Sequence, residues 1–188
     1  MSPRPGGETD KLGNRYELAW AIRHAFYCML DDRRALTAED IDVEVGRGSE
    51  FTYDTGLVIE VHQLKRQNGN SNSWTVKALA DLRIFEAAAK HVAAGRRYHF
   101  VSLVPCRPLQ EMSERARKST DLANFIDCWL TGELSPVFDQ LSAAEVLGGP
   151  QAAWDTLRGM WFLVQDEYDI IRMNSTLAKC NLNGSKVS

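Results

Sequence analysis

The sequence predicts an α/β fold, in which a mixed β-sheet is flanked by helices, and two observations carry this prediction. Hydrophobic periodicity changes along the chain from helical to alternating, back to helical, and once more to strand-like before a helical remainder. A strand–helix–strand connection favours parallel pairing of the strands that it joins, so the sheet should be mixed. With 188 residues, 44% of them apolar, the chain is long enough for one sizeable core.

The first elements are expected to be a helix and three strands. Residues 14–31 place apolar side chains at three- and four-residue spacings, which predicts a core helix. Thr37 and Asp40 are expected in a short turn, and IDVEV (41–45) in a first strand. EFTY and LVIEVHQL then predict a hairpin that turns at Asp54-Thr55-Gly56.

The polar tract NGNSNS predicts a loop between this hairpin and the next helix. Ser73 or Thr75 is expected to cap a helix over residues 76–95 that ends at Gly95, and residues 96–105 predict a fourth strand. After Pro108 only helical spacing recurs, in four or so short segments. We therefore expect a core over residues 1–107 and a helical extension over 108–188 that packs on it as part of one structural domain.

Charge is unevenly distributed along the chain. Residues 1–61 hold 7 Lys/Arg and 12 Asp/Glu, residues 62–118 hold 11 and 4, and residues 119–188 hold 4 and 9, which together give the net charge of −3. A basic middle third is typical of a phosphate-binding face, although ordinary solvated helices would give the same pattern. The four separated cysteines predict reduced, mostly buried thiols, and the absence of a roughly 20-residue apolar run predicts a cytoplasmic protein without a membrane anchor.

Three polar residues stand where two strands meet. Gln63 and Lys65 are two apart on the third strand and share a face, and Glu50 begins the neighbouring strand. Glu50 and Gln63 offer oxygen ligands for Mg²⁺ or Mn²⁺, which lowers the pKa of a bound water, while Lys65 orients that water or neutralises developing charge. The trio predicts phosphodiester hydrolysis. Asp54 is the alternative acid at the first position, and Glu44 is an accessory acid by position alone.

These residues also resemble a known family. Glu50, the hairpin and Gln63-x-Lys65 resemble the PD-(D/E)xK nuclease superfamily in its Mrr-like variant, in which glutamine stands at the second acidic position. HQLKRQ followed by SWTVKAL resembles the double-stranded DNA nuclease domain of bacterial anti-phage defence effectors, found on STAND NTPases and cyclic-nucleotide-activated nucleases. The resemblance spans roughly residues 6–104 and implies a restriction-endonuclease-like sheet. It departs from the family at Glu50, where aspartate is usual.

The resemblance adds one residue and several partners to the expected site. GNRYELAW matches the early helix of the family, which implies a catalytic role for Glu17. Double-stranded DNA is the expected substrate, and an NTPase or sensor module would belong to the same system. Apart from the resemblance, the acidic helical C-terminal third is expected to mediate self-association into a homo-oligomer. Lys and Arg supply most affinity for the DNA backbone, and the candidate phosphate contacts are Arg66, Lys77, Arg83, Arg96 and Arg97.

Two other functions fit the same residues. A catalytically inactive nuclease fold could serve as a binding or oligomerisation module, and an RNA-directed nuclease would use the same site. His62 alternates away from Gln63 and is interpreted as a packing residue, while His24, His91 and His99 show no ligand spacing. The tryptophans at helical spacings are interpreted as core residues, and Trp74, beside the loop, either packs beneath it or contacts DNA, with packing favoured.

Overall fold

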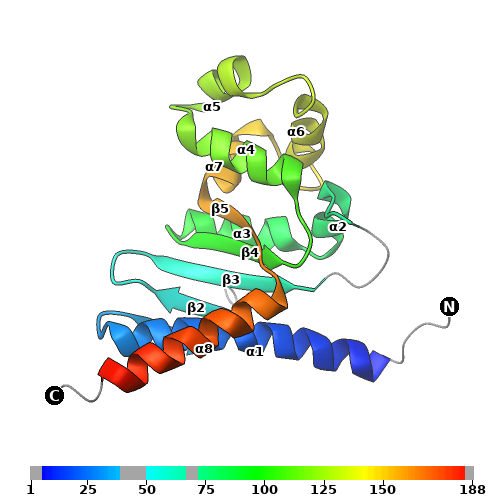
Figure 1. The fold of residues 1–188 in the computed structure, drawn as a ribbon. Coiled ribbons are helices and arrows are strands. Elements are labelled where there is room, and N and C mark those ends of the chain that lie inside the picture. Colours follow the sequence, from blue (N-terminus) through cyan, green and yellow to red (C-terminus); the bar gives the residue numbers. More distant parts are fainter. Residues whose placement is uncertain (1–5, 39–49, 67–71, 185–188) are drawn as a thin grey trace.

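A mixed five-stranded sheet forms the middle layer of the molecule (Figure 1). The computed structural model describes residues 6–38, 50–66 and 72–184. The strands follow chain order across the sheet: β1 (Ala35–Ala38), β2 (Phe51–Asp54), β3 (Ile59–Lys65), β4 (Arg97–Ser102) and β5 (Met160–Val164). Neighbours among β1, β2 and β3 are antiparallel, and those among β3, β4 and β5 are parallel. The predicted α/β class is confirmed, and β3 is the central strand.

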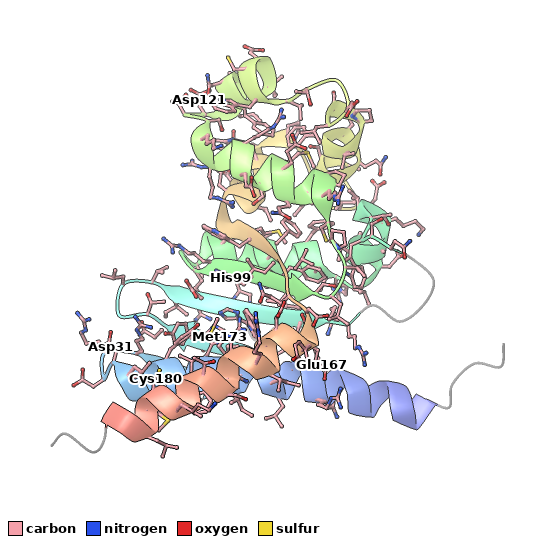
Figure 2. The ribbon with its side chains drawn as sticks, viewed as in Figure 1. Asp31, His99, Asp121, Glu167, Met173 and Cys180 are labelled. Atoms are coloured by element: carbon pink, nitrogen blue, oxygen red, sulfur yellow. The ribbon has the colours of Figure 1, made fainter. Side chains whose placement is uncertain are left out.

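Two long helices cover one face of this sheet. α1 (Gly6–Leu30) and α8 (Glu167–Gly184) lie side by side, far apart as they are in sequence (Figure 1). The helical spacing expected for α1 is confirmed, because Tyr16 and Trp20 are buried against Leu64 of β3 and Val101 of β4. An ion pair between Arg15 and Glu167 joins the two helices, and Figure 2 shows Glu167 at the start of α8. The first and the last of the described helices therefore contribute to one layer.

Shorter helices cover the opposite face. These are α2 (Val76–Asp81), α3 (Ile84–Ala93), α4 (Arg107–Lys118), α6 (Ser135–Ser142) and α7 (Pro150–Gly159), with α5 (Leu122–Asn124) and the π-helical turn η1 (Phe125–Trp129) between α4 and α6. Val61 of β3 and Phe100 of β4 are buried against Leu79, Phe85 and Met112 of these helices. The larger apolar core lies in this layer, and it fixes the face of β3 that carries Gln63 and Lys65.

The crossover between β3 and β4 contains two helices, not the single helix expected over residues 76–95. Thr75 caps α2 as predicted, because its side chain accepts a hydrogen bond from the backbone N–H of Ala78. The helix is interrupted at Leu82 and Arg83, and Arg83 adopts a left-handed conformation with φ of 58°. Gly95, with φ of 76°, follows the end of α3, as its sequence position indicates. The single-helix prediction is therefore wrong at residues 82–83.

Both edge strands differ from the prediction. Thr37 lies within β1 and pairs with Thr52, where a turn was expected. The first strand expected over residues 41–45 lies outside the described residues. β5 was expected to be the end of a helix, but Gly159 closes α7 and the chain turns directly into a strand paired with β4. Residues 1–107 and 108–188 therefore share one sheet.

The tryptophans were predicted to pack in the core and the cysteines to be mostly buried, and the structure agrees better with the first prediction than with the second. Trp20, Trp74 and Trp154 are buried, and the indole of Trp74 donates a 2.6 Å hydrogen bond to Ser102 Oγ. Among the cysteines only Cys106 is buried, whereas Cys128 and Cys180 are exposed, so the expectation of mostly buried thiols is wrong. Figure 2 places Cys180 toward the outer end of α8. In the described part of the chain, no helix has both the length and the apolar character to cross a membrane.

Candidate functional site

The polar end of β3 brings three of the predicted residues into contact. The backbone N–H of Glu50 donates to the carbonyl of His62 at 2.8 Å, so the ladder of β2 and β3 continues to Glu50. Gln63 Nε2 then donates to Glu50 Oε1 at 2.6 Å, and Lys65 Nζ donates to the same oxygen at 3.1 Å. The structure therefore places the amide and the ammonium on one carboxylate, as the strand periodicity indicates. Their catalytic role stays a prediction.

This cluster lies at the border between core and solvent. Gln63 is only 3% exposed, whereas the side chains of Glu50 and Lys65 are 28% and 33% exposed. Lys65 pairs with Ser102 at the carboxyl end of β4, and the hydrogen bond from Trp74 to Ser102 holds the start of α2 there. The cluster thus lies at the carboxyl ends of parallel strands, where ligand sites of α/β proteins are usually found.

Glu17 approaches the cluster from the other layer. Burial raises the pKa of the Glu17 carboxyl, the charge of Glu50 raises it further, and the charge of Lys65 opposes this rise. The adjacent Tyr16 fixes this part of α1, because its hydroxyl donates to the carbonyl of Gln165 at 3.0 Å. A second carboxyl group therefore lies within electrostatic reach of Glu50 and Lys65, and its role in catalysis stays a prediction.

The donor atoms suit a hard divalent cation. Glu50 and Glu17 offer carboxylate oxygens, and Gln63 offers an amide oxygen, the ligand type that Mg²⁺ and Mn²⁺ prefer. The Gln63 amide nitrogen faces Glu50 in this arrangement, where it satisfies the carboxylate. A rotation of the amide plane would exchange nitrogen for oxygen at this position. Mg²⁺ usually keeps several waters and needs only one or two carboxylates, so Glu50 and Gln63 fit it, with Glu17 within electrostatic reach.

The alternative acids are separated from this cluster. Asp54 pairs with Ile59 at the far end of the hairpin, and its Oδ1 accepts a 2.8 Å hydrogen bond from the backbone N–H of Gly56. Gly56 has φ of 80°, a conformation that suits glycine in a turn. Asp54 therefore shapes the turn, as its sequence position indicates. Glu44 lies outside the described residues.

The predicted DNA contacts are not gathered on one face. Arg66 directly follows Lys65, and its charge acts on Tyr16, so it lies at the same end of the sheet as the cluster. Lys77 is exposed near the start of α2 and pairs with Asp81 at 3.2 Å. Both residues could meet a phosphate backbone near Lys65.

The remaining predicted contacts lie elsewhere. Arg83 is exposed at the junction of α2 and α3, where it pairs with Glu86 at 2.7 Å. Arg96 and Arg97 lie at the start of β4, and Arg97 pairs in register with Glu60. Because strand residues rise about 3.3 Å each, Arg97 and Lys65 are separated by about 17 Å along the strands. Arg96 and Arg97 therefore belong to the opposite end of the sheet.

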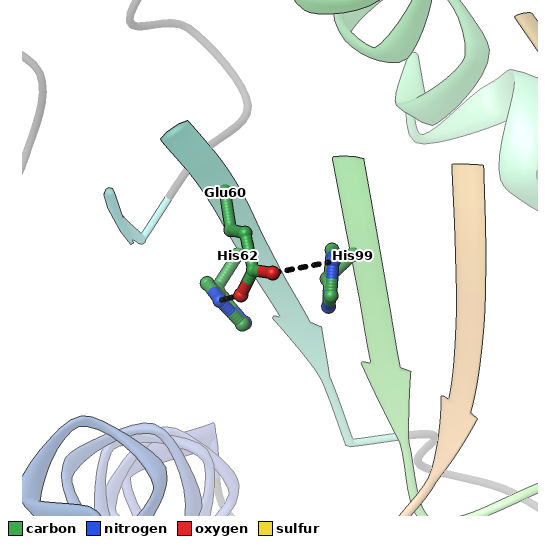
Figure 3. A group of neighbouring side chains, drawn as sticks. All are labelled: Glu60, His62 and His99. Atoms are coloured by element: carbon green, nitrogen blue, oxygen red, sulfur yellow. Dashed lines mark ion pairs between the residues drawn. The ribbon is translucent and has the colours of Figure 1, made fainter. Parts of the chain in front are cut away.

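A second cluster of chemically capable side chains occupies the other face of β3. In the described part of the chain, Glu60, His62 and His99 have donor atoms within 4.8 Å of one another, near enough to share a metal ion (Figure 3). Glu60 Oε2 lies 3.6 Å from His62 Nε2, and Glu60 Oε1 lies 3.8 Å from His99 Nε2. This group was not predicted from the sequence, because His62 and His99 meet only through the register of β3 and β4.

The histidines of this cluster form part of a row of rings across the sheet. Phe51, His62, His99 and Trp161 are successive partners in register on β2, β3, β4 and β5. Phe51 stacks on His62 with ring centroids 4.7 Å apart, and His99 stacks on Trp161 at 5.5 Å. The predicted packing role of His62 is confirmed, since its side chain is 1% exposed within this row.

A hydrogen bond from α1 limits what His62 can ligate. Trp20 Nε1, which can only donate, lies 3.1 Å from His62 Nδ1, so Nδ1 accepts and the proton of the neutral ring is on Nε2. Burial lowers the pKa of His62 to about 3 and keeps the ring neutral. The nitrogen that faces Glu60 therefore carries a proton and has no lone pair for a metal. This arrangement favours a role for the two histidines in packing and in facing the Glu60 carboxylate, and it disfavours metal binding at this cluster.

The two clusters differ in the chemistry that they can perform. The group around Glu50 combines oxygen donors, a cation and access to solvent, whereas the group around Glu60 is buried beneath a ring stack. Comparison of the chain with protein-family models, curated proteins and solved structures gave no match. No similar protein therefore assigns a function to either cluster.

Proposed function

We propose that this protein is a Mg²⁺-dependent DNA endonuclease with its active site at Glu50, Gln63, Lys65 and Glu17. The observation that carries the proposal is the convergence of Gln63 and Lys65 on one Glu50 oxygen, at 2.6 and 3.1 Å, where parallel strands end. The carboxylate and the amide oxygen can hold a divalent cation, and the ammonium can neutralise charge that develops during phosphodiester hydrolysis.

Each residue has a distinct role in this proposal. Glu50 and Gln63 hold the cation, with Glu17 as a further oxygen ligand or as the acceptor of a proton from water. Mg²⁺ or Mn²⁺, when bound, would lower the pKa of a water molecule so that it can attack phosphorus. Lys65 orients the attacking water and offsets the negative charge that develops on the phosphoryl oxygens.

The proposed substrate is double-stranded DNA. Arg66 and Lys77 lie nearest to the cluster among the predicted basic contacts and would neutralise backbone phosphates. The sequence resemblance of residues 6–104 supports a role as the effector of a bacterial anti-phage defence system, with self-association and an NTPase or sensor partner controlling when the nuclease cuts. We expect the protein to act in the cytoplasm.

Cleavage of supercoiled plasmid tests this function. The wild type should nick or linearise the plasmid with Mg²⁺ or Mn²⁺ and lose activity with EDTA. Lys65→Ala should reduce the rate about 100-fold or more, because it removes charge stabilisation from the transition state. Lys90→Ala is the matched control, since Lys90 is a half-exposed lysine on α3 paired with Glu86. Equal rates in wild type and Lys65→Ala would contradict the assignment, and preferential cleavage of RNA would change the substrate.

One observation favours a second function, that of a catalytically inactive binding or oligomerisation module. The Glu50 carboxylate is already satisfied by the Gln63 amide and by Lys65 in the absence of a cation. Such a closed cluster could serve only to hold β2 on β3. Failure of the wild type to cut DNA or RNA with Mg²⁺ or Mn²⁺, even when it is concentrated enough to self-associate, would establish this alternative.

A further inference from the structure

A second recess lies at the opposite end of the parallel strands from Glu50. Its volume is ≈ 810 Å³, and residues at the start of β4 and β5, the end of α3, and α4 and α7 line it. This size falls within the range of roughly 300–1,000 Å³ that is usual for small-molecule sites. Because strand residues rise about 3.3 Å each, Lys65 and the start of β4 are about 17 Å apart, so one small ligand cannot span both places.

The recess is strongly basic. Four arginines from three parts of the chain line it: Arg96, Arg97, Arg117 and Arg158. Among the described lining residues, Asp155 supplies the only carboxylate, and the side chain of Asp155 accepts a hydrogen bond from Gln151. Repulsion between like charges makes such a grouping costly unless an anion compensates it.

Two of these guanidinium groups are held in place by aromatic and backbone contacts. Arg117 Nη1 donates to Ser113 Oγ and to the carbonyl of Met160, each at 2.6 Å. The guanidinium carbons of Arg117 and Arg97 lie 4.4 and 5.2 Å from the centroid of the Trp161 ring. Stacking on an aromatic ring fixes a guanidinium while its N–H groups stay free to donate at its edge. The positive charge is therefore partly organised before any ligand arrives.

The surroundings of Arg117 and Arg97 show that these charges interact. Burial lowers the pKa of Arg117, the charge of Glu114 opposes this effect, and the charge of Arg97 lowers the pKa further. Glu60 lies 3.9 Å from Arg97, at the limit of an ion pair, and also faces His62 and His99. Glu60 and Glu114 therefore offset part of the positive charge of Arg97 and Arg117.

We propose that this recess binds a small phosphorylated anion with at least two negative charges, such as the polyphosphate group of a nucleotide. The planar fork of a guanidinium matches the spacing of phosphoryl oxygens, which permits paired charge-assisted hydrogen bonds. Arg97, Arg117 and Arg158 offer several such forks in one place, which suits an anion with more than one phosphoryl group better than a monocarboxylate. The site is independent of the proposed nuclease centre, and it gives a separate role to Arg96 and Arg97, which were expected to contact DNA.

Calorimetric titration of the full chain tests this site, with ATP and inorganic triphosphate as the two probes and no divalent cation present. Saturable binding of one molecule per chain is expected, and tighter binding of ATP than of triphosphate would show that the nucleoside is also recognised. The double variant Arg97→Gln/Arg158→Gln should weaken binding about tenfold or more. A thermal melt of each variant establishes that it is folded.

The control makes the same change in charge outside the recess. Arg33→Gln/Arg172→Gln replaces two exposed arginines that pair with Asp31 and Asp169. This control should keep the affinity of the wild type, as should Lys65→Ala. The proposal fails if neither probe saturates below millimolar concentration, if the control loses as much affinity as the recess variant, or if only a DNA duplex binds through Arg97 and Arg158.

Discussion

The two faces of β3 carry clusters of similar composition but different character. At the carboxyl end, Glu50 accepts hydrogen bonds from Gln63 and Lys65 and is partly open to solvent. Toward the amino end, Glu60 faces His62 and His99 in a buried row of rings. Each cluster has one carboxylate and nitrogen-bearing partners within reach, so proximity alone does not distinguish an active site from a packed core.

Protonation and exposure make the distinction. The two histidines of the Glu60 cluster are neutral because burial lowers the pKa of His62 and of His99 to about 3, and the Trp20 hydrogen bond fixes the tautomer of His62. The Glu50 cluster keeps charged groups partly exposed to solvent, where a cation can reach the Glu50 carboxylate and a phosphate can reach the Lys65 ammonium. The residue types alone would suggest a metal site at each cluster, whereas the hydrogen bonds favour only the site at Glu50.

Acid should destabilise the histidine face most. Burial lowers the pKa of His24, His62 and His99 to about 3, against about 6.5 in the unfolded chain. Below pH 6.5 the unfolded chain binds more protons than the folded one, so stability falls until about pH 3. At pH 5 each histidine costs about 2 kcal/mol and the three together about 6 kcal/mol. Urea unfolding at pH 7, 6 and 5 measures this, and equal stability at all three values would contradict it.

Gln63→Leu should impair chemistry and spare the fold. The side chain is 3% exposed on the apolar face shared with Val61, so leucine of similar size should pack there. Loss of one ligand oxygen should lower the rate of plasmid cleavage about 100-fold. Gln110→Leu on α4 makes the same chemical change elsewhere and should leave the rate unchanged. Full activity of Gln63→Leu would remove Gln63 from the proposed site.

His99→Phe should leave DNA cleavage intact and make the fold less sensitive to acid. Neither ring nitrogen of His99 has a hydrogen-bond partner among the described residues, and phenylalanine keeps the stack on Trp161. Stability at pH 7 should change by less than about 1.5 kcal/mol, whereas at pH 5 the variant should gain about 2 kcal/mol over the wild type. Urea unfolding at the two pH values supplies its own control. Loss of cleavage in this variant would instead place the metal at Glu60, His62 and His99.

Features that depend on local sequence were predicted well. The stripe on α1, the hairpin of β2 and β3, the Thr75 cap and the parallel crossover all follow from spacing and turn residues over short ranges. The contact of Glu50 with Gln63 and Lys65 belongs to this group, because a hairpin register and the two-residue period of a strand place them together.

Features that depend on long-range register were not predicted. The run of apolar residues 160–164 after Gly159 was read as helix, although a short continuous apolar run also fits a buried parallel strand. Gly159 packs against α3 so closely that an added Cβ would lie 2.2 Å from Val92 Cγ2, a constraint that no local pattern reveals. The ring row and the arginine recess likewise form only once β4 meets β3 and β5.

The most direct test exchanges one atom in each cluster of β3. Glu50→Gln and Glu60→Gln are the same isosteric change on opposite faces, and circular dichroism can establish that both variants fold. In a Mn²⁺-dependent plasmid cleavage assay, Glu50→Gln should reduce the rate about 100-fold or more, because it removes the charged metal ligand, while Glu60→Gln should cut within about threefold of the wild type. The opposite result, with Glu60→Gln inactive and Glu50→Gln active, would contradict the proposed site.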